Sequence, residues 1–506
     1  MSDFLFQYHA VEPTTWVYLS SLLLIGLFFK FGRLFSVRNL DLLLLILLGP
    51  GLLMVYYGQS ESSRIAEELP DVVAGNIDSS TEIETNAADL GESGSSSIPL
   101  NSELDGSIEG VAAAGIAEGG EQAREQVSEQ ESQAESQAES EEAIAKATEE
   151  ASAEFKKWKS LEVWGFGYLF GVSGLLLVRL LLDSIMVRRP LLEPNLSQGG
   201  LLFIGISLFV FLMGNVISEP ENPQSNATDY RIARVAPASS HGPGYELLSG
   251  LPTSFSKAFC VASQLLIAIG MVLIGYWHFR SIATGIGAAS LYLMLPYTSI
   301  LTGRIEHVLP AATLVWAVLY YRRPLVSGVL IGLASGLVYY PFFLLPLWIS
   351  FYWHRGIRRF LVSYIGTLTI LTALLLAFSA NGLQQDLVRM FGLHAPAMSE
   401  LGGIWNPEAG GLDANYRLPV LVAFVALSIS MALWPAQKNL GTLLSCSAAL
   451  MVAAQFWHGY GGGTYMAWYL PLMLLTVFRP NLEDRVAVSM LTDSWLPKKS
   501  SLPTAS

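Results

Sequence analysis

Three ionisable side chains stand close together between two apolar runs of the chain. Arg304, Glu306 and His307 follow a run that ends at Leu301, and the next run begins at Val308. Charged groups at a membrane boundary are costly unless they are paired or wetted. If they face an aqueous cavity, a cation, an acid and an imidazole suit phosphate contact or proton transfer. The alternative is that all three side chains simply extend to the membrane interface.

Two further places combine aromatic and polar groups. Tyr339 and Tyr340 lie inside a long apolar segment, and His458 directly follows Trp457. Each is explained either by the aromatic belt of a membrane interface or by a binding platform for substrate. The sequence shows no metal-ligand spacing and no nucleophile motif, and Cys260 and Cys446 both sit inside apolar runs.

The chain as a whole has the composition of a multi-pass membrane protein. Its 506 residues are 52% hydrophobic and 14% charged, and apolar runs near 20 residues recur along it. The basic residues are dispersed at the ends of these runs, which excludes a nucleic-acid-binding face. We predict an all-α bundle of about 11–13 transmembrane helices in a lipid bilayer. The predicted spans are Trp16–Phe35, Leu40–Tyr57, Trp164–Ile185, Gly199–Ile217, Phe255–Phe279, Ile282–Leu301, Val308–Tyr321, a segment within 325–353, Phe360–Phe378, Leu418–Trp434, Leu440–Trp457 and Tyr465–Phe478.

The segment Leu325–Trp353 is too long for one upright span. As a straight helix it would measure about 43 Å at ~1.5 Å per residue, against a hydrocarbon core of about 30 Å. Basic residues flank both of its ends, and basic loops favour the cytoplasm. We therefore predict a helical hairpin of Leu325–Val338 and Pro341–Trp353, turning at Tyr339–Tyr340. The alternative is one tilted helix.

The hairpin fixes which loops share a compartment. With it, the N-terminus lies outside and the C-terminus is cytoplasmic, in a cell or inner membrane or in the endoplasmic reticulum. All polar loops of unusual content then face outward. These outer loops are Ser218–Pro252, Gly303–His307, Tyr339–Tyr340, Ser379–Arg417 and His458–Thr464.

An acidic insertion interrupts the membrane sequence. Gly58–Phe155 holds 24 acidic and three basic residues, a net charge of −21, and Gly58–Glu154 has no aromatic residue. Such a composition predicts disorder, with a frayed helix through Glu121–Lys157 that continues into the next span. There Arg179 and Asp183 are four residues apart and are expected to pair.

We divide the chain into 1–57, an N-terminal hairpin; 58–160, the insertion; 161–198, the third span and its loop; 199–480, a transmembrane core; and 481–506, a cytoplasmic tail.

The run GRIEHVLPAATLVWAVLYYRRPLVSGVLIGLASGLVYYPFFLLPL resembles GT-C type membrane glycosyltransferases, in particular the polyprenyl-phosphate-mannose-dependent branch of bacteria. The similar features are a short outer turn that opens with Gly303, a span that ends at Arg322–Arg323, a small-residue segment around Gly332, and a break at Pro341. That family carries a basic residue near the break, and here Val338–Tyr340 stands in its place.

The resemblance implies transfer of a sugar from a polyprenyl-phosphate donor to an acceptor at the outer face. It implies a catalytic carboxylate in the first large outer loop, where Asp229 is the first candidate and Glu221 the second. Arg304 would steady the leaving phosphate. Some members of the family use a divalent metal and others do not. The alternatives are a catalytically inactive scaffold of this fold, or a transporter.

Overall fold

The structure of the protein is a computed structural model. It describes residues 11–68, 119–183, 194–218, 243–249, 253–301, 303–353, 355–378, 401–407, 410–435 and 438–480. Its regular elements in these ranges are all helical, which confirms the all-α prediction. The chain forms two compact units, Met1–Gly58 with Ser160–Ser506, here called the membrane unit, and Gln59–Lys159, the insert unit.

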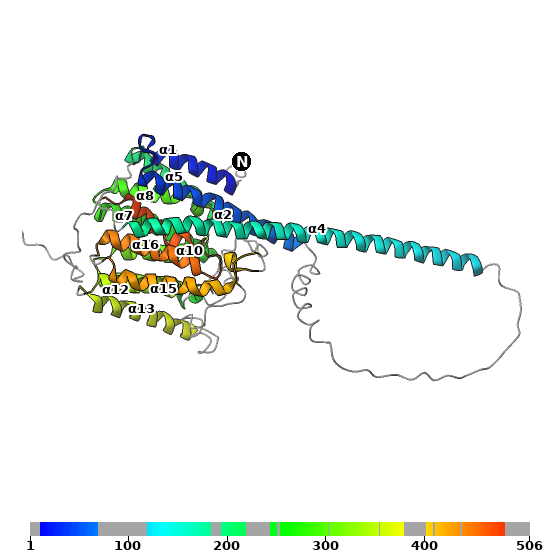
Figure 1. Cartoon of the computed structure of the whole chain (residues 1–506). Helices are drawn as coiled ribbons and strands as arrows, with labels where there is room; N and C mark the ends of the chain where they lie inside the picture. The colour runs from blue at the N-terminus through cyan, green and yellow to red at the C-terminus, as the bar shows by residue number, and fades with distance from the viewer. Residues whose placement is uncertain are drawn as a thin grey trace, which may run out of the picture. The chain divides into compact units, whose positions relative to one another are not determined.

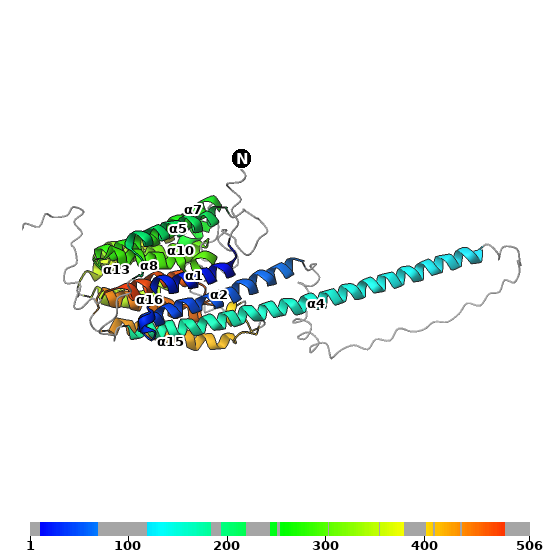
Figure 2. The same cartoon turned by 90° about the horizontal axis from the view of Figure 1, so that it is seen from above.

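The helices of the membrane unit run roughly side by side (Figures 1 and 2). Among the described residues, seven helices are long and apolar enough to cross a membrane, and shorter apolar helices accompany them. The protein is therefore a multi-pass helical membrane protein. The helices are α1 (Pro13–Phe28), α2 (Val37–Glu68), α4 (Gly119–Leu182), α5 (Gln198–Ser218), α6 (Pro243–Ser249), α7 (Thr253–Trp277), α8 (Ile282–Met294), α9 (Pro296–Ile300), α10 (Ile305–Leu319), α11 (Pro324–Leu337), α12 (Leu345–Phe351), α13 (Ile357–Phe378), α15 (Arg417–Leu433), α16 (Leu440–Trp457) and α17 (Leu470–Phe478), with the short 3-10 helices η1 (Phe31–Arg33), η3 (Tyr340–Leu344), η4 (Gly403–Trp405), η5 (Ala414–Tyr416) and η6 (Met466–Trp468).

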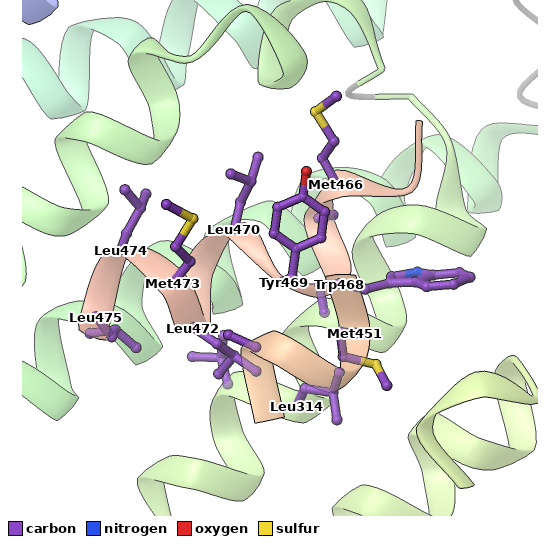
Figure 3. Close-up of a cluster of buried hydrophobic side chains, with 14 of the residues drawn as sticks. Leu314, Met451, Met466, Trp468, Tyr469, Leu470, Leu472, Met473, Leu474 and Leu475 are labelled. Atoms are coloured by element: carbon purple, nitrogen blue, oxygen red, sulfur yellow. The ribbon is translucent and has the colours of Figure 1, made fainter. Parts of the chain in front are cut away.

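Helix α16 is the centre of the membrane unit. Of the apolar stretch of α16, 94% is buried inside the protein. The corresponding fractions are 22% for α5 and 17% for α13. Small Ala, Ser and Gly residues all around α16 let neighbouring helices approach it closely. Figure 3 shows part of this core, where Met451 of α16 and Leu314 of α10 lie beside Trp468 and the apolar side chains of α17.

The hairpin is confirmed. Helix α11 ends at Leu337, the chain turns at Val338–Tyr339, and η3 and α12 return. The Tyr352 hydroxyl donates to the backbone oxygen of Tyr321 at 2.7 Å, so the end of the segment lies beside its beginning. A Cβ atom at Gly356 would likewise meet Pro324 at 2.8 Å.

A glycine stripe joins the first arm of the hairpin to α13. Gly328, Gly332 and Gly336 recur every four residues and therefore share one face of α11. A Cβ atom at Gly328 would lie 2.5 Å from the backbone oxygen of Phe360, and one at Gly332 would lie 3.1 Å from that of Tyr364. Only glycine permits these backbones to approach so closely, and the order of the contacts makes α11 and α13 parallel.

The substitution Gly328→Ala should destabilise the membrane unit by about 1–3 kcal/mol, because the added methyl group overpacks the α11–α13 contact. The matched control is Gly366→Ala on α13, where a new Cβ meets nothing within 4 Å. Alanine there should be neutral or stabilising by about 0.5–1 kcal/mol. Unfolding midpoints of the two purified variants in detergent measure the difference, and equal midpoints would contradict the packing assigned to the stripe.

Four charged side chains, three of them buried, connect three distant parts of the chain. Arg179 pairs with Asp183 at 3.1 Å, as predicted, and also contacts both carboxylate oxygens of Asp41, at 2.6 and 2.9 Å. Arg479 closes the set by donating to Asp183 at 2.6 Å. This charge cluster of two carboxylates and two guanidinium groups balances its own charge and ties together α2, α4 and the end of α17.

The charge cluster lies at one end of the membrane unit, here called the basic end. Phe478 of α17 packs against Gly287 near the start of α8. At the end of α7, Nε2–H of His278 donates a hydrogen bond of 2.8 Å to the backbone oxygen of Leu319, and its ring contacts Tyr321. The loops between α7 and α8 and between α10 and α11 thus meet at the same end.

The insertion differs from the prediction at its first edge and agrees with it at its second edge. Disorder was expected for Gly58–Glu154, yet α2 continues to Glu68. The helix expected from Glu121 is confirmed and begins at Gly119. Ala, Glu and Gln favour helix, and a segment that continues a spanning helix needs no new nucleus. Residues 69–118 lie outside the described residues.

Candidate functional site

The second end of the membrane unit, here called the loop face, brings together three of the predicted outer loops. It is formed by Gly303–His307, Val338–Tyr340 and His458–Thr464. The chain around Gly402 also joins it, since the backbone nitrogen of Gly402 donates to the backbone oxygen of Gly459 at 2.9 Å. The convergence of these loops at one end agrees with the hairpin topology.

A column of five rings runs through the loop face. Tyr297 of α9 stacks on His307 of α10, with ring centroids 6.1 Å apart. Tyr465 contacts both imidazoles, those of His307 and His458, at 4.3 Å each. His458 in turn stacks on Tyr340 of the hairpin turn at 4.8 Å. This ring column brings together three predicted site residues, His307, His458 and Tyr340.

One ring nitrogen of His307 has a hydrogen-bond partner among the described residues and the other has none. Nδ1 shares a hydrogen bond of 2.9 Å with the hydroxyl of Tyr297. Nε2 has no hydrogen-bond partner among the described residues, although the side chain is fully buried. Its nearest acidic neighbour is Oε1 of Glu306, at 4.0 Å. A polar contact of this length is suited to a bridging oxygen atom, and a buried polar atom without a partner calls for an explanation.

Glu306 is held at the start of α10. Its backbone oxygen accepts a hydrogen bond of 3.1 Å from the indole of Trp468, which fixes the first turn of the helix. The carboxylate is only 8% exposed, and a negative charge in a first helical turn is favoured by the helix dipole. Arg304, at the N-cap of the same helix and half-buried, acts on this carboxylate through its charge.

Tyr339 belongs to a neighbouring aromatic group rather than to the ring column. Its ring stacks on Phe342 at 6.2 Å and meets Phe343 and Trp457 edge-on. It is half-buried in the hairpin turn. Of the six predicted substrate-binding residues, Tyr339 is therefore the one with the most clearly interfacial surroundings.

The sequence did not single out Arg417 or Tyr465. Arg417, from α15, is 4% exposed, and its Nε donates to the backbone oxygen of Trp457 at 2.7 Å. Its guanidinium also lies over the Trp457 ring, and the centroid of that ring is 5.0 Å from the centroid of the Tyr340 ring. A basic group thus reaches the hairpin break from a different part of the chain. No local pattern around Arg417 or Tyr465 signals this, because both positions depend on the packing of separate helices.

The two predicted catalytic residues, Asp229 and Glu221, lie outside the described residues. Among the residues that the structure does describe, no group of three or more potential metal ligands occurs. The predicted site residues within the described part of the chain therefore all belong to the loop face. Comparison with known proteins finds no match to a family model, a curated protein or a solved structure.

Proposed function

We propose that this membrane protein transfers a sugar from a polyprenyl-phosphate donor to an acceptor on the outer face of the membrane, and that the loop face is its site. The observation that carries the proposal is the buried pair of Glu306 and His307, whose 4.0 Å gap and open Nε2 suit a bridging substrate oxygen. Burying such a pair costs stability, because the buried polar groups lose their contacts with water. A ligand that hydrogen-bonds to them would offset this cost.

The groups around the pair have the chemistry that this transfer needs. The acceptor hydroxyl oxygen attacks the anomeric carbon of the sugar, the bond from that carbon to the phosphate oxygen breaks, and polyprenyl phosphate leaves. A carboxylate takes the proton of the hydroxyl. By the resemblance this base is Asp229, with Glu221 as second candidate, while Glu306 and His307 orient the sugar. Arg304 and Arg417 supply positive charge for the leaving phosphate.

The orientation of the protein is part of the proposal. The loop face would be periplasmic or lumenal, and the basic end would be cytoplasmic, because basic loops are retained there. The C-terminus would then lie in the cytoplasm. A divalent cation at the phosphate is compatible with this chemistry, since it would neutralise the same charge as the arginines.

One observation favours a second candidate, a catalytically inactive scaffold. The ring column is almost completely buried, with exposed fractions of 0% for His307, 1% for His458 and 3% for Tyr340. Side chains this deep commonly serve packing. In that case the column would be a rigid connection between α10, the hairpin and α16.

Transfer assays in proteoliposomes distinguish the candidates. Wild-type protein should move radiolabelled mannose, or another hexose, from its polyprenyl phosphate to an acceptor, and protein-free vesicles should not. Absence of transfer from every labelled donor by folded protein would favour the scaffold, and uptake of a labelled solute into the vesicles would favour the transporter.

The substitution Asp229→Asn tests the assignment of the base. It removes the proton acceptor and should lower transfer by about 10²–10⁴-fold. Glu221→Asn, made in the same loop, is the matched comparison and should have the smaller effect. Full transfer by Asp229→Asn would show that the base lies elsewhere.

A further inference from the structure

A purely apolar groove opens between α5, α7 and α8, away from the loop face. Its volume is about 300 Å³, and the surface that it exposes is entirely apolar. Ile206 of α5, Ala268 of α7 and Ala289 of α8 are among the lining residues. Two of these three helices are long and apolar enough to cross a membrane, so we expect the groove to open toward hydrocarbon. The volume is within the range of ligand pockets.

The groove is built from close helix contacts rather than left by poor packing. Gly205 lets α5 approach α8, since a Cβ atom there would lie 2.8 Å from Oγ of Ser290. That hydroxyl donates to the backbone oxygen of Leu201 at 3.1 Å. The one hydroxyl in the lining is therefore satisfied within the protein, and only a hydrocarbon chain matches what remains.

A positive charge lies beyond the groove, in the turn that connects two of its three helices. The lining residues of α7 belong to its second half and those of α8 begin at Ile286, and the turn between the two helices carries Arg280. Arg280 is exposed and has a φ angle of +57°, a left-handed conformation that a side chain other than glycine rarely adopts. Backbone of this kind tends to persist where a side chain has a function.

We propose that this groove binds one acyl chain of an anionic glycerophospholipid, whose phosphate contacts Arg280. The acyl chain gains little binding free energy in the groove, because the bilayer that it leaves is equally apolar. Selectivity must therefore come from the charged headgroup, and basic sites between transmembrane helices are known to select anionic lipids. One arginine near the membrane surface corresponds to about a fivefold preference. The proposal is independent of sugar transfer.

Photo-crosslinking of lipids to the full chain in nanodiscs tests this site. Phosphatidylglycerol and phosphatidylcholine, each with a diazirine in one acyl chain, are compared at equal concentration, and labelled peptides are mapped by mass spectrometry. In wild-type protein, phosphatidylglycerol should label the lining segments of α5, α7 and α8 about fivefold more than phosphatidylcholine does. Equal labelling by the two lipids would overturn the proposal.

Three variants locate the selectivity. Arg280→Gln should abolish the preference, whereas Arg358→Gln, which removes another exposed arginine from the basic end, should retain it. Ala268→Phe should fill the groove and reduce labelling by both lipids. Its unfolding midpoint is measured alongside, and Ile206→Phe, on the opposite wall, replaces it if it does not fold. Equal loss of preference in Arg280→Gln and Arg358→Gln, or undiminished labelling in a folded groove-filling variant, would refute the site.

Discussion

Replacing Arg179 by methionine is expected to lower the free energy of unfolding by about 3–5 kcal/mol. Arg179 contacts Asp41 twice, at 2.6 and 2.9 Å, and Asp183 at 3.1 Å, and its side chain is only 8% exposed. Without the guanidinium, two buried carboxylates lose a shared counter-charge. The loss is large because a buried carboxylate that loses a contacting guanidinium keeps its desolvation cost and forfeits that attraction.

The measurement is the unfolding midpoint of the purified variant in mixed detergent, compared with wild type. The control Arg358→Met removes a basic side chain from α13 that is exposed, and it should change stability little. The double variant Arg179→Met with Asp41→Asn should recover part of the loss, since Asp183 retains Arg479 at 2.6 Å. Equal midpoints for Arg179→Met and Arg358→Met would show that the charge cluster does not stabilise the fold.

The substitution Glu306→Gln removes a group that orients the sugar, so it should lower sugar transfer by about 10²-fold while leaving the unfolding midpoint unchanged or raising it. The amide has nearly the shape of the carboxylate but neither its charge nor its basicity. Trp468 binds the backbone oxygen of residue 306, so this anchor of α10 survives the substitution. A buried charge is removed, and its desolvation cost disappears with it.

The combination of lost transfer with preserved stability separates a functional role from a structural one. Glu61→Gln is the matched control, because Glu61 belongs to a partly exposed ion pair with Arg64, at 2.8 Å, within the insert unit. It should affect neither transfer nor stability measurably. If Glu306→Gln instead lowers the midpoint and transfers sugar at the wild-type rate, the carboxylate supports the fold and the assignment of the site fails.

Features set by local pattern could be predicted from the sequence. The hairpin followed from the length of Leu325–Trp353 and its two basic ends, and its turn at Val338–Tyr339 overlaps the predicted turn at Tyr339–Tyr340. The pair Arg179–Asp183 followed from a spacing of four residues on one helix. The helical continuation of the insertion into α4 followed from its composition.

Contacts between distant parts of the chain could not be predicted in this way. Asp41 is 138 residues from Arg179, and Asp183 is 296 residues from Arg479, so no local spacing relates them. The ring column has the same character. His307, His458 and Tyr340 stood out individually, but Tyr465 joins them only through the packing of α10 and α16.

The most direct test of the proposed site is to locate the donor on the protein. A polyprenyl-phosphate mannose that carries a diazirine on its sugar is crosslinked to the full chain in vesicles, and the labelled peptides are identified by mass spectrometry. We predict that the label falls on the peptides containing Arg304–His307 or His458–Tyr465, and that excess unlabelled donor suppresses it. Label confined to other segments, or label that unlabelled donor does not displace, would contradict a donor site at the loop face.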